Sequence, residues 1–318
     1  MIDPGLVFGP VPSRRLGQSL GINNIPSKVC TYACVYCQVG RTRRMPLARR
    51  AFFDPGELAD AAAARVDAAR RAGERIDALT LVADGEPTLD AGLGRLVDAL
   101  GRLAIPVAVI SNASLVDRPE VRGELARADW VSLKVDAARE AAWRRVNRPH
   151  PRLDLAAIQD GIRAFAREFG GTLVTETLLV AGFNDGEADL ARTADFLAEV
   201  APATAYLAVP VRPPAESGAR APSAETVNRA YQALTARLPS VELLTGYEGD
   251  AFAASGDLRA DLLSICAVHP MREDAVAALM ARDGAGPEDL RALVSSGELA
   301  EVTHEGRRFY LRRPPRDS

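Results

Sequence analysis

Three of the four cysteines in this chain lie within eight residues, and they are the side chains best suited to chemistry. They are Cys30, Cys34 and Cys37, with the spacing C-x3-C-x2-C. Three thiolates on one loop can hold an iron-sulfur cluster and leave one iron without a protein ligand. Such an iron can bind and activate a second molecule. The spacing therefore predicts a metal centre with an open coordination position.

Zinc and disulfides are the alternatives for these cysteines. A structural zinc ion needs a fourth ligand, and the candidates are distant in the sequence: Cys266, His269, His150 and His304. Disulfides are disfavoured because four cysteines in 318 residues are sparse and no signal peptide precedes them. We therefore favour an iron-sulfur cluster and expect a reducing, cytoplasmic location.

Short apolar runs alternate with helical patterns through most of the chain. The expected strands are residues 20–23, 76–83, 105–111, 130–135, 172–180 and 204–209. The expected helices are residues 54–72, with Asp54 as N-cap, a helix capped by Asp117, residues 155–169, a helix from Glu187 and a helix through residues 227–238. This alternation predicts six strand-helix units with parallel strands. Functional residues of such folds gather at the carboxyl ends of the strands.

Polar residues do follow the predicted strands at those ends. They are Gly85, Glu86 and Pro87 after the second strand, Ser111 and Asn112 after the third, and Ser132, Lys134 and Asp136 on the fourth. By alternation the last three share one face of their strand. A buried lysine and aspartate need partners, which a ligand or an internal ion pair would supply. Further polar groups expected near the mouth are Glu176, Thr177, Asn184, Asp185 and Arg212, with the segment 147–150 as a substrate contact or a structural turn.

The cysteine spacing, with Tyr36 directly before the last cysteine, resembles the signature of the radical S-adenosylmethionine (radical SAM) superfamily. In that family a [4Fe-4S] cluster binds the methionine part of SAM at its open iron. One electron then cleaves SAM and releases a 5′-deoxyadenosyl radical that takes a hydrogen atom from the substrate. The resemblance implies a partial (β/α)6 TIM-like barrel, with Cys30, Cys34 and Cys37 as cluster ligands.

The resemblance extends to the motifs at the strand ends. Gly85 and Glu86 resemble the family's glycine-glycine-glutamate element, which receives the SAM amino group, with Asp84 in place of the usual first small residue. Ser111 and Asn112 resemble a threonine-asparagine-glycine element of the family. Ala113 stands at the position where that element more commonly has glycine. The implied SAM contacts are Tyr36, Gly85, Glu86, Pro87, Ser111, Asn112, Ser132, Lys134 for the carboxylate and Asp136 for the ribose.

Residues 11–17, 20–23, 38–42 and 85–89 resemble one branch of the family, which is related to the wyosine tRNA base synthase. Two features argue against that enzyme itself. Cys266 is the single spare cysteine, too few for a second three-cysteine site. The chain beyond residue 50 is acidic, which does not favour nucleic acid.

Charge is uneven along the chain although the net charge is only −3. Residues 1–50 carry eight lysines and arginines against one aspartate, a local charge of +7. These cations suit an acidic electron donor such as flavodoxin or ferredoxin, a phosphate-bearing substrate or the SAM carboxylate. No apolar run approaches the ~20 residues that a membrane helix needs, so no membrane partner is expected.

Residues 246–318 are expected to form a separate C-terminal domain. Helices at 258–268, 273–282 and 287–296 and a hairpin at 301–310 suggest a winged-helix-like domain beside a radical SAM barrel of residues 1–245. Residues 256–318 carry nine arginines and eleven acidic residues, so this domain does not favour nucleic acid either. The resemblance thus implies a radical SAM enzyme acting on a small metabolite, a peptide or an RNA base. The alternative is a non-catalytic zinc or iron-sulfur regulator with a winged-helix reader.

Overall fold

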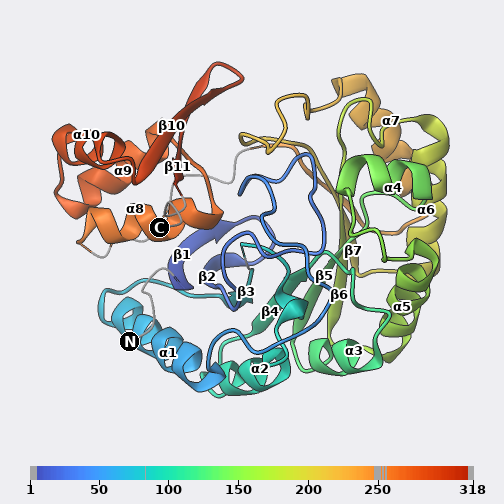
Figure 1. The fold of residues 1–318 in the computed structure, drawn as a ribbon, viewed down its shortest axis with the longest axis horizontal. Helices are drawn as coiled ribbons and strands as arrows, with labels where there is room; N and C mark the ends of the chain where they lie inside the picture. The colour runs from blue at the N-terminus through green and yellow to red at the C-terminus, as the bar shows by residue number, and fades with distance from the viewer. Residues whose placement is uncertain (1–5, 83, 247–251, 253, 255, 314–318) are drawn as a thin grey trace.

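A computed structural model describes residues 6–82, 84–246, 252, 254 and 256–313 of the chain (Figure 1). Its main feature is an eight-stranded sheet in the order β1 to β8. The strands are β1 (Val7–Ser13), β2 (Gly17–Ile22), β3 (Ala78–Leu81), β4 (Val107–Ser111), β5 (Trp130–Lys134), β6 (Thr172–Leu178), β7 (Thr204–Ala208) and β8 (Val241–Leu244). Neighbouring strands from β2 to β8 are parallel, and β1 is antiparallel to β2.

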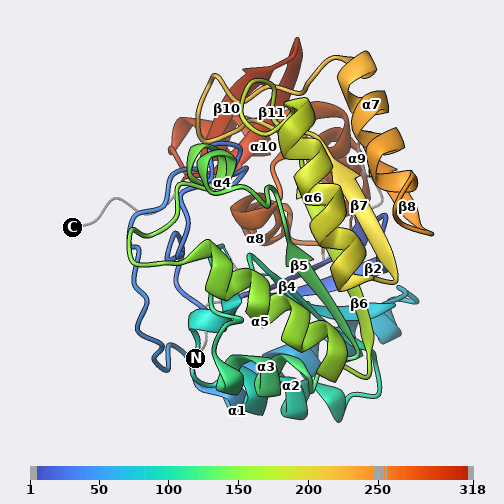
Figure 2. The same ribbon diagram turned by 90° about the vertical axis from the view of Figure 1, so that its right-hand side faces the viewer.

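Helices cover the convex face of this curled sheet (Figures 1 and 2). They are α1 (Pro55–Arg71), α2 (Leu93–Gly101), α3 (Pro119–Leu125), α5 (Leu155–Glu168), α6 (Glu187–Val200) and α7 (Ala224–Thr235). The helix α4 (Glu140–Asn147) and the short 3-10 helix η2 (Pro87–Leu89) lie in the connections that follow β5 and β3. The loop that carries the cysteines lies on the concave side (Figure 1). The sheet is therefore a partial, TIM-like barrel with the cysteine loop inside its curve.

The six predicted strands are confirmed, because each overlaps an observed strand. A helix follows each of them, although the helix after β3, α2, was not predicted. Asp54 caps α1 as expected, and its side chain accepts hydrogen bonds from the amides of Gly56 and Glu57. The cap predicted at Asp117 is wrong. The N-cap of α3 is Arg118, because the helix begins at Pro119, whose fixed φ suits a first helical turn. Ala83, the end of one predicted strand, lies outside the described residues.

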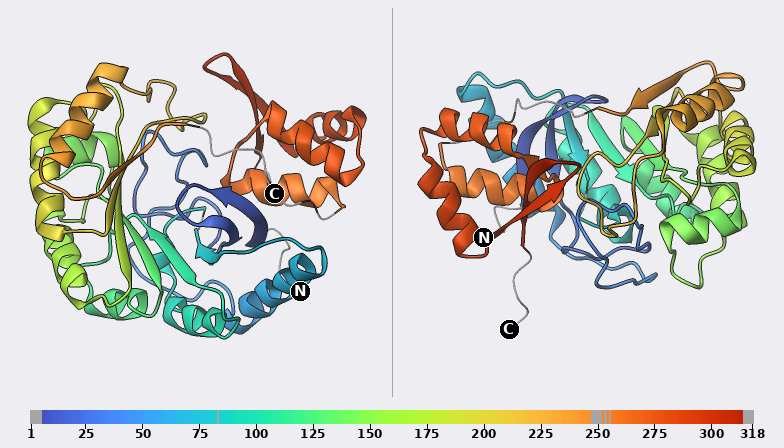
Figure 3. Two further views of the ribbon diagram at one scale, coloured as in Figure 1. Left: turned by 180° about the vertical axis from the view of Figure 1, so that it is seen from behind. Right: turned by 90° about the horizontal axis from the view of Figure 1, so that it is seen from above.

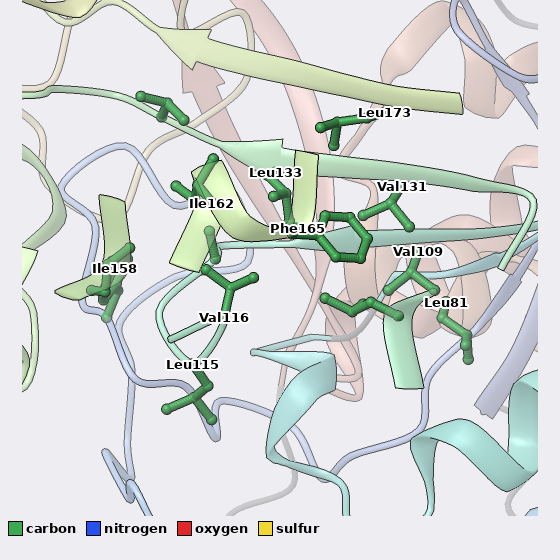
Figure 4. Close-up of a cluster of buried hydrophobic side chains, with 14 of the residues drawn as sticks. Leu81, Val109, Leu115, Val116, Val131, Leu133, Ile158, Ile162, Phe165 and Leu173 are labelled. Atoms are coloured by element: carbon green, nitrogen blue, oxygen red, sulfur yellow. The ribbon is translucent and has the colours of Figure 1, made fainter. Parts of the chain in front are cut away.

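A buried apolar cluster joins α5 to the sheet (Figure 4). Ile158, Ile162 and Phe165 fall on one face of the helix and contribute to the same core as Val131 and Leu133 of β5. Phe165 is fully buried. Full burial of each such side chain stabilises the fold by roughly 1.5–3 kcal/mol. This packing fixes β5, whose carboxyl end carries Lys134.

The C-terminal segment contains α8 (Leu258–Val268), α9 (Glu273–Asp283), α10 (Pro287–Ser295) and a sheet in the order β10-β11-β9, formed by β10 (Leu299–His304), β11 (Arg307–Arg312) and β9 (Met271–Arg272). The three predicted helices and the hairpin are present. These elements lie beside β1 (Figure 3), where Phe8 and Val11 share an apolar cluster with Leu262 and Ile265 of α8. None of the described helices is long and apolar enough to cross a membrane.

Candidate active site

One pocket on the concave side holds most of the predicted site. It has a volume of about 330 Å³ and is lined by all three clustered cysteines. Tyr36, Gly85, Glu86, Ser111, Asn112 and Lys134 line the same pocket. The structure therefore brings together residues from the cysteine loop and from the carboxyl ends of β3, β4 and β5.

Backbone contacts on both sides fix the cysteine loop. The amide of Cys30 donates to the carbonyl of Arg44 at 3.0 Å, and the amide of Ala33 donates to the carbonyl of Asn147 at 3.0 Å. Val29 forms bridges to Arg44 and to Gly85. The loop is thus tied to its own returning chain, to the segment that follows β3 and to the end of α4.

Gly85 sits where the cysteine loop crosses the end of β3. A Cβ atom at this position would lie 1.9 Å from the carbonyl oxygen of Val29 and 2.7 Å from Cδ1 of Ile25. Real Cβ atoms do not approach a carbonyl oxygen so closely. Glycine is therefore required for the loop to pack against the strand end.

The Glu86 carboxylate is buried and organises the neighbouring strand end. Its Oε1 accepts hydrogen bonds from the hydroxyls of Thr88 and Ser111, at 2.6 and 2.7 Å, and Oε2 accepts from the amide of Asn112 at 2.7 Å. Burial raises the pKa of Glu86, while these donors oppose that rise. Carboxylate oxygens accept more than one donor, so an ammonium group in the pocket has an acceptor here.

Asp84, which departs from the family pattern, has partners of its own. Its Oδ1 accepts from Lys28 Nζ at 3.0 Å, and Oδ2 accepts from the Ser27 hydroxyl at 2.6 Å. Lys28 has φ +63°, and both charged side chains are less than a tenth exposed. The pair therefore joins the start of the cysteine loop to the end of β3 and leaves no buried charge uncompensated.

Lys134 lies in a chain of alternating charges. Its Nζ is 2.7 Å from Glu176 Oε1 and 3.9 Å from Asp136 Oδ1, and Arg15 pairs with the other oxygen of Glu176. Burial opposes the charged form of Glu176, but Lys134 and Arg15 outweigh it and lower its pKa to about 2. Lys134 is kept charged: burial would lower its pKa, but Asp136 and Glu176 raise it.

Asp136 faces the cysteine loop rather than the pocket. Its Oδ2 accepts from the Tyr36 hydroxyl and from Asn147 Nδ2, and its Oδ1 accepts from the amide of Leu178 at 2.9 Å. The aspartate is 4% exposed and is not among the pocket-lining residues. The carboxylate therefore positions Tyr36 and Asn147 from behind.

Two other predicted SAM contacts also lie outside the pocket lining. Pro87 is buried, and its carbonyl accepts a hydrogen bond from Asn24. Ser132 is fully buried, and its hydroxyl has no hydrogen-bond partner among the described residues. Both residues are therefore buried in the protein and do not line the pocket.

The other polar residues that were predicted near the mouth of the barrel also divide into two groups, those that line the pocket and those that do not. Glu176 and Arg212 line the pocket. Thr177 donates to the carbonyl of Val135, Asn184 donates to the carbonyl of Asp136, and Asp185 accepts from the amide of Gly182. These three therefore stabilise loops. His150 holds the cysteine loop through its amide, which donates to the carbonyl of Thr31 at 2.9 Å.

His269 is a pocket residue that the sequence pattern did not reveal. It follows α8 of the C-terminal segment, and its Nε2 lies 2.8 Å from a terminal nitrogen of Arg212. Burial, together with the charge of Arg212, lowers the pKa of His269, so the ring is neutral. A neutral ring can accept from the guanidinium. Only the three-dimensional packing of the C-terminal segment brings these residues together.

The three thiols suit an iron-sulfur cluster. Burial raises the pKa of all three, and that of Cys34 reaches about 12, so metal binding must displace the protons. In the described parts of the chain, no three His, Cys, Asp or Glu side chains are grouped to hold a metal ion. A four-iron cluster places each thiolate on a different iron, so its ligands do not have to converge on one ion. Cys266 is buried outside this pocket.

Comparisons with known proteins agree with this geometry. The Radical SAM superfamily model matches residues 24–197. A UPF0026 protein of Methanocaldococcus jannaschii is 40% identical over 309 residues, which cover 96% of each protein. Among solved structures, a radical SAM methyltransferase from Sphaerobacter thermophilus has a TM-score of 0.54 at 20% identity and covers 71% of this chain and 66% of that chain.

TYW1 with a lysine-pyruvate adduct bound has a TM-score of 0.54 at 15% identity, covering 69% of this chain and 74% of that chain. These likenesses confirm the partial-barrel fold, and the family match favours an enzyme over a non-catalytic regulator. TYW1 is the wyosine synthase. The 40% identical relative is a UPF0026 protein and not TYW1, which agrees with the expectation that this chain is related to the wyosine synthase but is not that enzyme itself. Since the family model covers more than half of the sequence, the chain belongs to the radical SAM superfamily of enzymes.

Proposed function

We propose that Cys30, Cys34 and Cys37 hold a [4Fe-4S] cluster and that SAM binds beside it in the same pocket. The observation that carries this proposal is that the three thiols share one pocket with the strand-end motifs. When bound, the cluster supplies the electron that cleaves SAM reductively to start radical chemistry.

The chain's own residues have complementary tasks in this proposal. Glu86 offers carboxylate oxygens to the SAM ammonium, and Lys134 offers a permanent positive charge to its carboxylate. Tyr36, Gly85, Ser111 and Asn112 line the remaining surface next to the cluster. Pro87, Ser132 and Asp136 support these groups from behind.

We further propose that residues 246–318 form a winged-helix-like domain that selects the substrate beside the barrel of residues 1–245. His269 supports this role because it belongs to the C-terminal segment and lines the same pocket as the cysteines. The β1–β2 turn also contributes Arg14 and Arg15 to this wall. A small metabolite or a peptide suits this enclosed site better than a folded nucleic acid does.

The electron donor in this proposal is an acidic protein such as flavodoxin or ferredoxin. The cysteine loop continues into a segment with five arginines between residues 41 and 50. Positive charge beside the loop would steer an acidic donor toward the cluster, and the association rate would fall with added salt.

Anaerobic reconstitution tests the proposed function. The wild-type protein should take up about four iron and four sulfide per chain. With dithionite and SAM it should then form 5′-deoxyadenosine, whereas a variant in which all three clustered cysteines are alanine should form none. A folded wild-type protein that takes up no iron and cleaves no SAM contradicts the proposal.

A further inference from the structure

Two of the three clustered thiols have a side-chain amide beside the sulfur. Asn112 Nδ2 lies 3.4 Å from Cys30 Sγ, and Asn147 Nδ2 lies 3.4 Å from Cys34 Sγ. Sulfur is larger than oxygen, so its hydrogen bonds are longer. The two amides reach the cysteine loop from different segments, one after β4 and the other at the end of α4.

The other partners of these amides establish that nitrogen, not oxygen, faces each sulfur. Asn147 Nδ2 lies 2.6 Å from a carboxylate oxygen of Asp136, which only accepts. The Oδ1 of Asn112 accepts from the amide of Ser114 at 2.9 Å, so its Nδ2 is at the opposite end, next to Cys30. A flipped side chain would lose these bonds at either position.

Both amides are also held rigidly. Asn147 is 2% exposed, and its own carbonyl accepts from the amide of Ala33 within the cysteine loop. Asn112 Nδ2 also donates to the Thr31 hydroxyl at 2.9 Å, and its backbone amide donates to Glu86. Reorienting either donor would therefore break several hydrogen bonds, so the N–H groups are fixed before a cluster is present.

We infer that Asn112 and Asn147 are positioning residues that raise the reduction potential of the cluster by donating hydrogen bonds to two of its thiolates. This inference rests on the proposed cluster. Reduction adds one electron from the reductant and increases the negative charge on the sulfurs. Donors already aimed at those sulfurs stabilise the reduced state more than the oxidised state, and hydrogen bonds to sulfur are a known determinant of cluster potential.

The test is the midpoint potential of the reconstituted protein without SAM, measured by redox titration with electron paramagnetic resonance (EPR) detection. The substitutions Asn112→Ala and Asn147→Ala should each shift the potential to a more negative value. Their effects should add in the double variant, because they act on different sulfurs. The control Asn228→Ala removes an exposed asparagine of α7 and should titrate like the wild type.

The outcomes separate this inference from the proposed function. Variants with a full complement of iron that titrate at the wild-type potential overturn the inference alone. A wild-type protein that takes up no cluster overturns the proposed function and the inference together. Because Asn147→Ala also removes a partner of Asp136, Asn112→Ala provides an independent test from a different loop. A merely structural role would lower the unfolding temperature without moving the potential.

Discussion

Neutralising Glu176 should destabilise the fold, because this carboxylate lies between two cations at the edge of the pocket. Lys134 Nζ is 2.7 Å away, and Arg15 contacts the other oxygen. The side chain of Glu176 is 13% exposed, so solvent screens these charges weakly. The substitution Glu176→Gln keeps the shape of the side chain but leaves the charges of Lys134 and Arg15 without this partner.

The size of the effect follows from the pKa of Glu176, which falls from the usual 4.5 to about 2 in the folded protein. That difference corresponds to about 3 kcal/mol of folding stability at neutral pH. Breaking a buried ion pair by removing one partner costs a similar 3–5 kcal/mol or so. Since the folded pKa is depressed, this stability is present above about pH 4.5 and is lost as the pH falls toward 2.

Urea unfolding of the protein without cluster measures the effect. At pH 7, Glu176→Gln should lower the free energy of unfolding by about 3 kcal/mol, and the difference from wild type should shrink as the pH falls below 4.5. The control Glu225→Gln removes an exposed partner of Arg229 and should change stability by less than about 0.5 kcal/mol. A loss below about 1 kcal/mol at pH 7, or a difference that does not vary with pH, refutes the reasoning.

Three further predictions concern the cluster, the packing at Gly85 and SAM binding. After anaerobic reconstitution, Cys34→Ala should lose most of its iron and Cys266→Ala should retain it, because only the first thiol lines the pocket; equal iron contents contradict the assignment. Gly85→Ala should lower stability by about 1–3 kcal/mol, since its Cβ would meet a backbone carbonyl. Gly101→Ala has open space around its Cβ and should be nearly neutral in the same thermal melts. Lys134→Met should weaken equilibrium SAM binding about tenfold or more, the value of a charged hydrogen bond; unchanged affinity places the SAM carboxylate elsewhere.

Local signals were sufficient to predict most of the barrel. The proline after Asp54 and the apolar face around Phe165 depend only on neighbouring residues, so α1 and α5 were predicted close to their observed bounds. The parallel order of the strands then places Glu86 and Lys134 at one edge without further information. Those side chains were identified because each ends or follows a strand.

Features that depend on packing between distant segments were not predicted. Strand β1 contains Gly9, Pro10 and Pro12, which argue against a strand. An irregularity between Phe8 and Val11 accommodates Gly9 and Pro10, and Pro12 is tolerated opposite Gln18 because β1 is an edge strand. The short strand β8 and the helices α2 and α4 were not predicted either, although Leu93, Leu96, Val97 and Leu100 of α2 do repeat at helical spacing.

Two pocket contacts were also beyond the sequence, because each joins residues far apart in the chain. The Arg15 contact with Glu176 depends on the edge hairpin of β1 and β2, and the His269 contact with Arg212 depends on how α8 packs against β1. The family resemblance implied that Asp136 contacts the SAM ribose. Its observed partners, Tyr36 and Asn147, come from the cysteine loop and from α4, a helix that was not predicted.

The central claim is that the three thiols hold a cluster with one iron open to the pocket, and adding SAM to the reduced, reconstituted protein tests it most directly. An open iron that binds SAM should change the EPR spectrum of the reduced cluster. The change should saturate with SAM concentration and should weaken in Lys134→Met. A reduced cluster with full iron content whose spectrum is identical with and without saturating SAM contradicts the claim.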